Sequence, residues 1–191
     1  RILDIGAVNQ NGDTFHSSVV GEFMKFISSA EYLCGHNIVS HDIKYIEPFL
    51  KKSYKLIDTL YLSPILFPER PYHNLIKDDK ILSDQLNNPL SDSLKAKELF
   101  EDELERFKEL PENVKRAYFD LLNNNRYFHG FFDFAQYSSS RLSYLFNSKA
   151  DNISDILQGM VCSKANISHI ADTTPTELAY SLAIIRTGDR Y

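Results

Sequence analysis

The feature that most narrows the possible folds is a strand–turn–strand pattern at the start of the chain. Residues 2–8 form an apolar, β-branched run, residues 9–13 read NQNGD, and residues 14–20 read TFHSSVV, a second candidate strand. Asn-Gly between two such runs is a strong hairpin signal, because both residues tolerate positive φ angles. The sequence therefore predicts an antiparallel pair of strands joined by a tight turn.

Helix and strand patterns alternate after this hairpin. Helical segments show apolar residues at a spacing of three to four, whereas strand segments are short apolar runs rich in β-branched residues. The expected elements are a helix at 21–29, a strand at 31–35, a helix from Asp42, a strand at 55–59 and a long helix from Pro89. Such an alternation after a hairpin predicts an α/β domain with a mixed sheet.

The sequence changes character from Glu101 onward. Helical periodicity continues to the last segment, and no further strand pattern is present. We therefore divide the chain into an α/β part, residues 1–104, and an all-α extension, residues 105–191. The many Phe and Tyr residues between Tyr118 and Tyr144 are expected to form helical core instead of a surface that stacks nucleic-acid bases.

Composition limits the classes of function. The formal charge of -5 over 191 residues argues against a strongly basic nucleic-acid-binding surface, but is compatible with a nuclease that holds cations at carboxylates. Cys34 and Cys162 lie in apolar contexts and predict buried free thiols in a reducing, cytoplasmic compartment. No apolar run long enough for a membrane span is present, so no membrane partner is expected.

The stretch CGHNIVSHDIKYI, residues 34–46, places several polar side chains where a strand passes into a helix. Carboxylates at strand ends and on facing helices are how proteins hold hard divalent cations. Asp42 opens one helix and Asp92 lies in the first turn of another, so each is either a metal ligand or a helix-capping acid. Asp4 is expected to be a hydrogen-bonding residue of the sheet, and Asp58 to fix a loop at a strand end.

The order of four segments, ILDIGAV, GHNIVSHDIKYI, LIDTLYLSPILFP and NNPLSDSLKAKELF, resembles the DnaQ-like 3′–5′ exonucleases over residues 2–104. The resemblance implies a ribonuclease-H-like mixed sheet flanked by helices, followed here by the all-α C-terminal extension. It matches Asn37 and Asp42 to the second motif of the family, with His41 in the position of an aromatic residue. It matches Asp92 to the carboxylate of the third motif.

This resemblance also implies an activity. The family hydrolyses phosphodiester bonds from the 3′ end of nucleic acid, here favouring DNA, with two Mg²⁺ or Mn²⁺ ions. Asp42 and Asp92 would be the catalytic metal ligands, and Asn37 and His41 would contact substrate. One alternative is a catalytically degenerate module that binds nucleic acid or docks a helicase core without hydrolysis. Another is a scaffold domain whose acids only cap helices.

The chain departs from the family pattern at the general base. Counting back from Asp92 places Asn87 and Asn88 where the family has a histidine or a tyrosine. An amide does not accept a proton at neutral pH, so neither asparagine can act as the base. His73 is the candidate that could replace it.

The chain also lacks the Asp-x-Glu motif of the family's first strand. We expect this motif in a segment upstream of Arg1, on a strand that lies between the strands at 2–8 and 31–35. Without such a strand, the backbone groups along both neighbouring edges would need other partners. Direct pairing of residues 2–8 with residues 31–36 would contradict this expectation.

Three further segments, RPYHNLIKDDK, NNPLSDSLKAKELF and PTELAYSLAIIRT, are similar to the N-terminal region of large bacterial RecQ-type DNA helicases that carry an exonuclease-like module. The similarity implies a helicase domain in the same polypeptide. It also implies a single-stranded DNA end as the nucleic-acid partner and a role in DNA repair.

Overall fold

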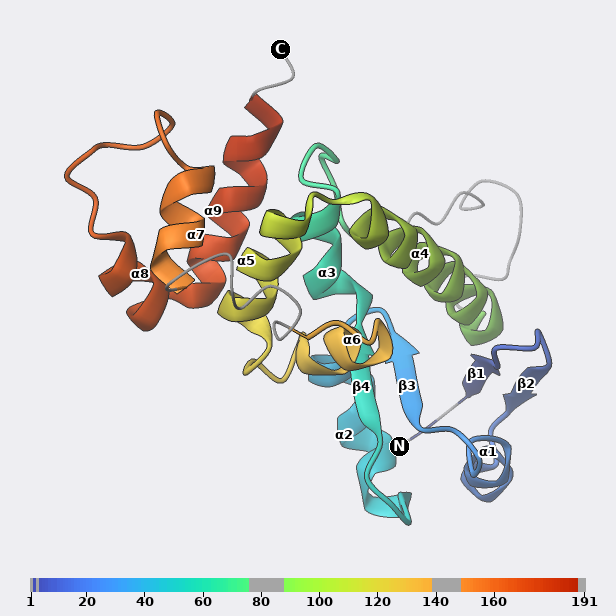
Figure 1. Cartoon of the computed structure of the whole chain (residues 1–191). Coiled ribbons are helices and arrows are strands. Elements are labelled where there is room, and N and C mark those ends of the chain that lie inside the picture. The colour runs from blue at the N-terminus through green and yellow to red at the C-terminus, as the bar shows by residue number, and fades with distance from the viewer. Residues whose placement is uncertain (1, 3, 76–87, 139–148, 189–191) are drawn as a thin grey trace.

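The computed structural model describes residues 2, 4–75, 88–138 and 149–188. Strands and short helices occupy the first part of the chain, and helices the rest (Figure 1). In order, the described elements are β1 (Ile5–Val8), β2 (Thr14–Ser17), α1 (Val20–Phe26), β3 (Tyr32–Gly35), a π-helical turn η1 (Ile38–Asp42), α2 (Ile43–Ile46), a 3₁₀ turn η2 (Glu47–Phe49), β4 (Lys55–Asp58), α3 (Thr59–Leu66), α4 (Pro89–Glu109), α5 (Glu112–Leu122), α6 (His129–Phe134), α7 (Lys149–Ile156), α8 (Ile167–Thr173) and α9 (Pro175–Gly188).

The predicted hairpin is confirmed. β1 and β2 pair antiparallel, with Val8 opposite Thr14 next to the turn. In the turn, the Asp13 backbone N–H donates to Asn9 Oδ1 at 2.9 Å, and Asn9 Nδ2 donates to the Asp13 carboxylate at 2.8 Å. Gly12 has a φ of 91°, which a glycine adopts without steric cost. Local turn chemistry therefore fixes the register of this pair.

The second pair of strands is parallel. β3 pairs with β4 from Tyr32 opposite Lys55 to Gly35 opposite Asp58. Within the described residues, no ladder joins β1 to β3. The α/β class is thus confirmed, but the strands form two separate pairs instead of one mixed sheet. The direct pairing that would contradict an intervening strand is not found in the described part of the chain.

Helix α4 connects the two strand pairs. It crosses beside β1 and β2 and runs toward the helical half of the molecule (Figure 1). Near its start, the Ser93 hydroxyl lies 2.8 Å from the Gly6 carbonyl oxygen, to which it can donate. A Cβ atom on Gly6 would lie 2.2 Å from the Pro89 backbone, so only glycine permits this close approach. The helix therefore packs directly against β1.

Two hydrophobic clusters hold the elements together. The larger one joins β4 and α3 to the later helices and includes fully buried side chains such as Phe128, Ile153 and Leu182. It therefore connects the α/β part to the helical extension, and the division that we placed at residue 104 falls inside α4. The smaller cluster lies between the strand pairs and α1 and consists of Phe23, Ile27, Leu33, Ile38 and Val39.

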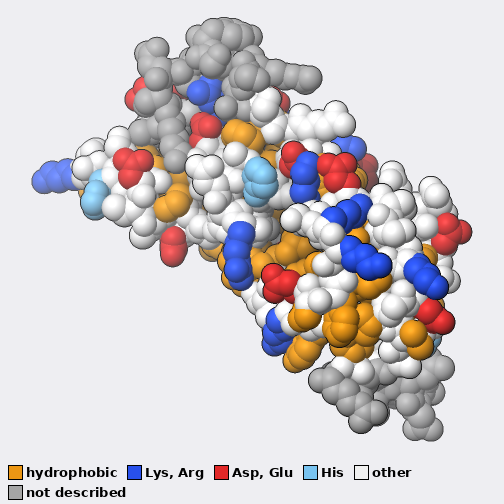
Figure 2. Space-filling view, turned by 90° about the horizontal axis from the view of Figure 1, so that it is seen from below, with side chains coloured by type: hydrophobic (Ala, Val, Ile, Leu, Met, Phe, Trp, Pro, Cys, Tyr) orange, Lys and Arg blue, Asp and Glu red, His pale blue; other side chains and the backbone are white. Residues whose placement is uncertain are grey.

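Viewed from below, hydrophobic side chains gather among charged groups in the right half of the molecule (Figure 2), the side on which β1, β2 and α1 lie in Figure 1. Among the described helices, none is both long enough and apolar enough to cross a lipid bilayer.

The expectation that both cysteines are buried is wrong, since Cys34 and Cys162 are free and exposed. The alternation of side chains along β3 explains Cys34. Its neighbour Leu33 points into the smaller cluster, so Cys34 points to the opposite face.

Candidate functional site

The loop between β3 and α2 carries the residues matched to the second motif, and we call residues 36–42 the second-motif loop. Asp58, at the end of β4, holds this loop in place. Its carboxylate is 0% exposed and accepts hydrogen bonds from the backbone N–H groups of Asn37 at 2.8 Å and Val39 at 3.0 Å. It also caps α3 through the Leu60 N–H at 3.1 Å. The prediction that Asp58 fixes a loop is confirmed.

Burial and hydrogen bonding act in opposite directions on the Asp58 carboxyl. Desolvation raises its pKa, and the three N–H donors partly offset that rise by favouring the charged form. A buried carboxyl that receives three hydrogen bonds is costly to replace, because each amide would lose its partner. The second-motif loop is therefore attached to the parallel strand pair by a polar group and not by apolar packing alone.

The backbone of the loop turns sharply at Asn37. This residue has a φ of 65° in the left-handed region, where asparagine is among the few side chains commonly found. Ile38 and Val39 follow and are both buried in the smaller cluster. Within the described residues, the Asn37 side-chain amide makes no hydrogen bond, so it is available to a ligand. The backbone of Asn37 thus forms the turn, and its side-chain amide remains available to a ligand.

Asp42 does not cap a helix. It has right-handed helical φ and ψ angles, continues the π-helical turn into α2 and makes no capping hydrogen bond with its side chain. The side chain is 57% exposed, and its Oδ1 atom lies 3.2 Å from Nδ1 of His41. The His41 ring is also exposed and packs edge-on against Tyr45, with 6.0 Å between ring centres. Asp42 thus lies at the N-terminus of α2, but no capping hydrogen bond supports the helix-capping alternative.

Asp92 lies in the first turn of α4 and is partly buried. The capping of this helix falls to Asn88, whose Oδ1 accepts from the backbone N–H of Leu90 at 3.0 Å and of Ser91 at 3.4 Å. Asn88 therefore has a structural role. Asn87, at the position of the family's histidine, lies outside the described residues.

The implied metal centre needs a cluster of oxygen ligands. In the part of the chain that the structure describes, no group of three or more His, Cys, Asp or Glu side chains is placed to hold a metal ion. Asp42 and Asp92 alone therefore do not fit a site for two Mg²⁺ or Mn²⁺ ions, which requires several carboxylates.

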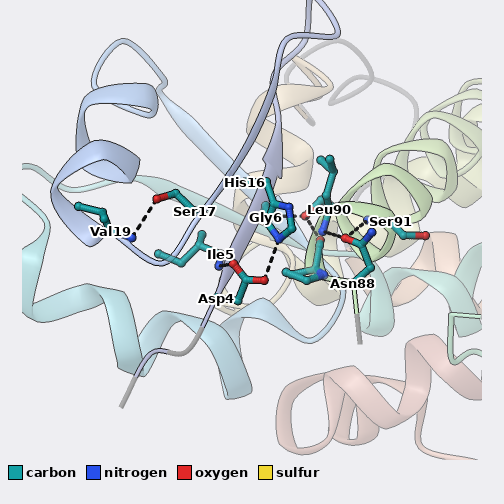
Figure 3. A network of polar contacts seen from close by, with 11 residues as sticks. Asp4, Ile5, Gly6, His16, Ser17, Val19, Asn88, Leu90 and Ser91 are labelled. Carbon is teal, nitrogen blue, oxygen red and sulfur yellow. Dashed lines mark hydrogen bonds and ion pairs between the residues drawn. The ribbon is translucent and has the colours of Figure 1, made fainter. Parts of the chain in front are cut away.

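Asp4 takes part in the hairpin network shown in Figure 3. Its Oδ2 atom lies 2.7 Å from His16 Nε2 on β2, and its Oδ1 atom accepts from the Ile5 N–H at 3.0 Å. Asp4 is thus a hydrogen-bonding residue next to the sheet, as predicted.

Two histidines meet at the start of α3. His36 Nδ1 lies 3.0 Å from the Thr59 hydroxyl, and His73 Nδ1 lies 2.9 Å from the Ser63 hydroxyl one turn later. Burial lowers the pKa of both imidazoles, and the proximity of His73 lowers that of His36 further. His73 therefore lies close to His36 of the second-motif loop, although its segment is distant in sequence.

Sequence reasoning missed two groups near this loop. The first is Glu103 on α4, which is 0% exposed and whose two carboxyl oxygens have no hydrogen-bond partner in the described structure. Burial raises its pKa to about 10. Glu103 lies four residues after Leu99 and four before Phe107, in the apolar stripe of the helix. This spacing was the sequence signal that could have predicted its burial.

The second group brings together three elements, and we call it the tyrosine cluster: Ser40, Tyr61, Arg126 and Tyr127. The rings of Tyr61 and Tyr127 stack with 4.1 Å between their centres. The Ser40 hydroxyl lies 3.4 Å from the Tyr61 hydroxyl, and Arg126 Nη2 donates to the Tyr127 hydroxyl at 3.3 Å. No local sequence pattern predicts this contact, because its members lie on η1, α3 and the turn before α6.

Comparison of the chain with protein-family models, curated proteins and solved structures found no match. Its function is therefore inferred from the order of its motifs and from the geometry around the second-motif loop.

Proposed function

We propose that this chain belongs to a DnaQ-like 3′–5′ exonuclease domain that acts on DNA ends within a larger helicase or repair protein. The proposal rests on one observation, which is that Asp42 is an exposed carboxylate on a loop that the fold holds in place. A buried carboxylate, Asp58, fixes the loop before it, and Asp42 itself extends into solvent without a capping role. An acid held on a rigid turn but not used by the fold is suited to bind a ligand.

The arrangement of the strands supports a ribonuclease-H-like sheet. An antiparallel pair and a parallel pair share the smaller hydrophobic cluster, which includes Leu33 from β3 and is packed by Ile5 from β1. One additional strand between β1 and β3 would join the two pairs into a mixed sheet of the expected kind. The expected Asp-x-Glu segment would be that strand.

The same segment would complete the donor set for Mg²⁺ or Mn²⁺. Its two carboxylates, added to Asp42 and Asp92, would give the oxygen-rich environment that these ions need. We therefore expect the 191-residue chain to bind DNA without cleaving it, and a polypeptide that also contains the segment to cleave it.

A catalytically degenerate module is the second candidate. It is favoured by the absence, among the described residues, of any group of three side chains able to hold a metal ion. Such a module would keep the second-motif loop for binding and would perform no hydrolysis. A scaffold that uses its acids only as caps is less well supported, because the Asp42 side chain makes no capping hydrogen bond.

Cleavage of single-stranded DNA separates these candidates. A 5′-labelled oligonucleotide is incubated with Mg²⁺ or Mn²⁺ and a longer polypeptide that includes the residues encoded upstream of Arg1, beside its Asp42→Asn variant. The exonuclease proposal expects stepwise shortening from the 3′ end and its loss in the variant. A longer polypeptide that binds the oligonucleotide but leaves it intact would establish the degenerate module instead.

A further inference from the structure

The tyrosine cluster is attached to the second-motif loop at a specific point. Ser40, which supplies one of its hydroxyls, lies two residues before Asp42 on the same π-helical turn. The other hydroxyls come from Tyr61 on α3 and Tyr127 in the turn before α6. Three hydroxyls and one guanidinium group therefore come together on the turn that also carries Asp42, the exposed carboxylate that we assign to the DNA end.

The turn that carries Arg126 and Tyr127 is held in place from within the fold. Asn125 Oδ1 accepts from the Tyr127 N–H at 3.0 Å, and Asn125 Nδ2 donates to the Thr176 hydroxyl on α9 at 3.1 Å. On the opposite side, the Tyr180 hydroxyl donates to the Tyr61 backbone carbonyl at 3.2 Å. Helix α9 thus fixes both tyrosines, so the cluster does not need to be ordered by a ligand.

The cluster has the chemistry of an anion site. Arg126 is exposed, and its guanidinium group lies 5.0 Å from the centre of the Tyr127 ring. Hydrogen bonds from the Ser40 and Arg126 side chains lower the pKa of the Tyr127 hydroxyl, as expected where donors surround an oxygen. A guanidinium group and the hydroxyls of Ser and Tyr are all donors that proteins use to bind phosphate oxygens.

We propose that Ser40, Tyr61, Arg126 and Tyr127 bind a backbone phosphate of single-stranded DNA and thereby place the strand beside Asp42. The identity of this ligand rests on the proposed function, whereas the anion-binding chemistry rests on the cluster alone. The phosphate replaces the weak contacts among the hydroxyls with charge-assisted hydrogen bonds. The stacked rings keep the donors in position, and the helical extension becomes part of the binding surface.

Binding of a fluorescent single-stranded thymidine oligonucleotide to the 191-residue chain, measured by anisotropy without divalent metal over a range of salt concentrations, tests this proposal. Arg126→Gln should weaken binding roughly tenfold and reduce the slope of log K against log salt by about 0.7, the value for one phosphate contact on a single strand. Lys108→Gln is the matched control, because it removes the same charge from an exposed position on α4. It should leave the affinity and the slope unchanged.

Two further variants separate direct contact from a change in folding. Tyr127→Phe and Ser40→Ala each remove one hydroxyl and keep the packing, so each should weaken binding without changing the circular dichroism spectrum or the melting temperature. An affinity and salt slope for Arg126→Gln equal to those of the wild type would overturn the proposal. Displacement of the oligonucleotide by inorganic phosphate at an equal phosphate concentration would also overturn it, by showing a site for free phosphate.

Because the measurement excludes metal, it is independent of hydrolysis. If the longer polypeptide fails to cleave DNA while Arg126→Gln still weakens binding, the exonuclease proposal fails and the phosphate site stands. If the longer polypeptide cleaves DNA and Arg126→Gln binds normally, the phosphate site is wrong and the exonuclease proposal stands.

Discussion

The helical half and the strand half of the molecule are stabilised in different ways. In the helical half, aromatic and aliphatic side chains from several helices pack into one extended cluster around Phe107, Phe128 and Phe131. In the strand half, the apolar cluster is small, and polar contacts attach the elements to one another. The Asp58 carboxylate and the Ser93 hydroxyl are examples.

This difference indicates where binding is possible. Close apolar packing fills the interior of the helical half, whereas the strand half presents Asp42, His41 and Asn37 on a loop that one buried carboxylate fixes. Ligand-binding segments are commonly drawn from less densely packed regions. The tyrosine cluster lies between the halves, and Tyr127 packs against both hydrophobic clusters.

The largest expected effect compares the two clusters directly. Phe131→Ala in the helical half removes a side chain that is 1% exposed, and should lower the free energy of unfolding by about 3–5 kcal/mol. Phe15→Ala in the strand half removes a partly buried ring and should lower the free energy of unfolding by clearly less than Phe131→Ala does. Denaturant unfolding of both variants measures the difference. Equal losses would show that the two halves are equally well packed.

Asp58→Asn should have the next largest effect. The amide retains one accepting oxygen and turns a donor toward a backbone N–H, so stability should fall by about 2–3 kcal/mol. Hydrogen exchange at the Asn37 and Val39 amides should become faster than elsewhere. Asp42→Asn is the control, since its exposed side chain makes no contact on which the fold depends. A stable Asp58→Asn chain with protected amides would contradict the role of Asp58.

Glu103 gives the helical half a pH dependence. Its pKa in the folded chain, about 10, lies above its ordinary value of 4.5. The associated stability is therefore complete below pH 4.5 and is lost progressively as the pH rises toward 10, by at most about 1.4 kcal/mol per pH unit. The difference in unfolding free energy between wild type and Glu103→Gln should change with pH in this window.

The exposed Glu105→Gln on the same helix is the matched control for this measurement. Its unfolding free energy should follow that of the wild type at every pH. A pH-independent difference between wild type and Glu103→Gln would mean that Glu103 titrates normally.

Tyr32→Phe should have the smallest effect. The Tyr32 hydroxyl donates to Asp133 on α6, which also pairs with Lys55 at 2.6 Å, and this contact connects the strand half to the helical half. The substitution keeps the ring packed on Phe134 and leaves the Lys55 pair intact. The melting temperature should fall by less than in Asp58→Asn. If the melting temperature of Tyr32→Phe fell as far as that of Asp58→Asn, the hydrogen bond from Tyr32 to Asp133 would be a principal connection between the two halves.

The parts of the fold that sequence predicted are those set by local chemistry. The hairpin follows from the Asn-Gly turn, and α4 begins where Asn88 and Pro89 together provide a cap and a first residue. Pro48 lies just after the end of α2, where the chain passes into a 3₁₀ turn. The loop-fixing role of Asp58 was predictable because a polar residue at a strand end commonly bonds the adjacent loop.

The parts that sequence did not predict depend on contacts between distant segments. Glu103 looks like one more acid in EDELERF, and only packing of α4 against its neighbours buries it. Likewise, the region around Tyr127 is mostly core, as expected from its aromatic content, yet this one ring reaches Tyr61. Its position depends on where α9 places the turn before α6, which no local pattern encodes.

Hydrogen exchange of the 191-residue chain, with and without single-stranded DNA and in the absence of metal, tests the central claim most directly. The claim is that the second-motif loop and the tyrosine cluster together form the DNA-binding surface. DNA should slow exchange in residues 36–45 and 123–129 and leave α7 and α8 unchanged. Protection confined to other segments, or no protection at a DNA concentration that saturates binding, would contradict it.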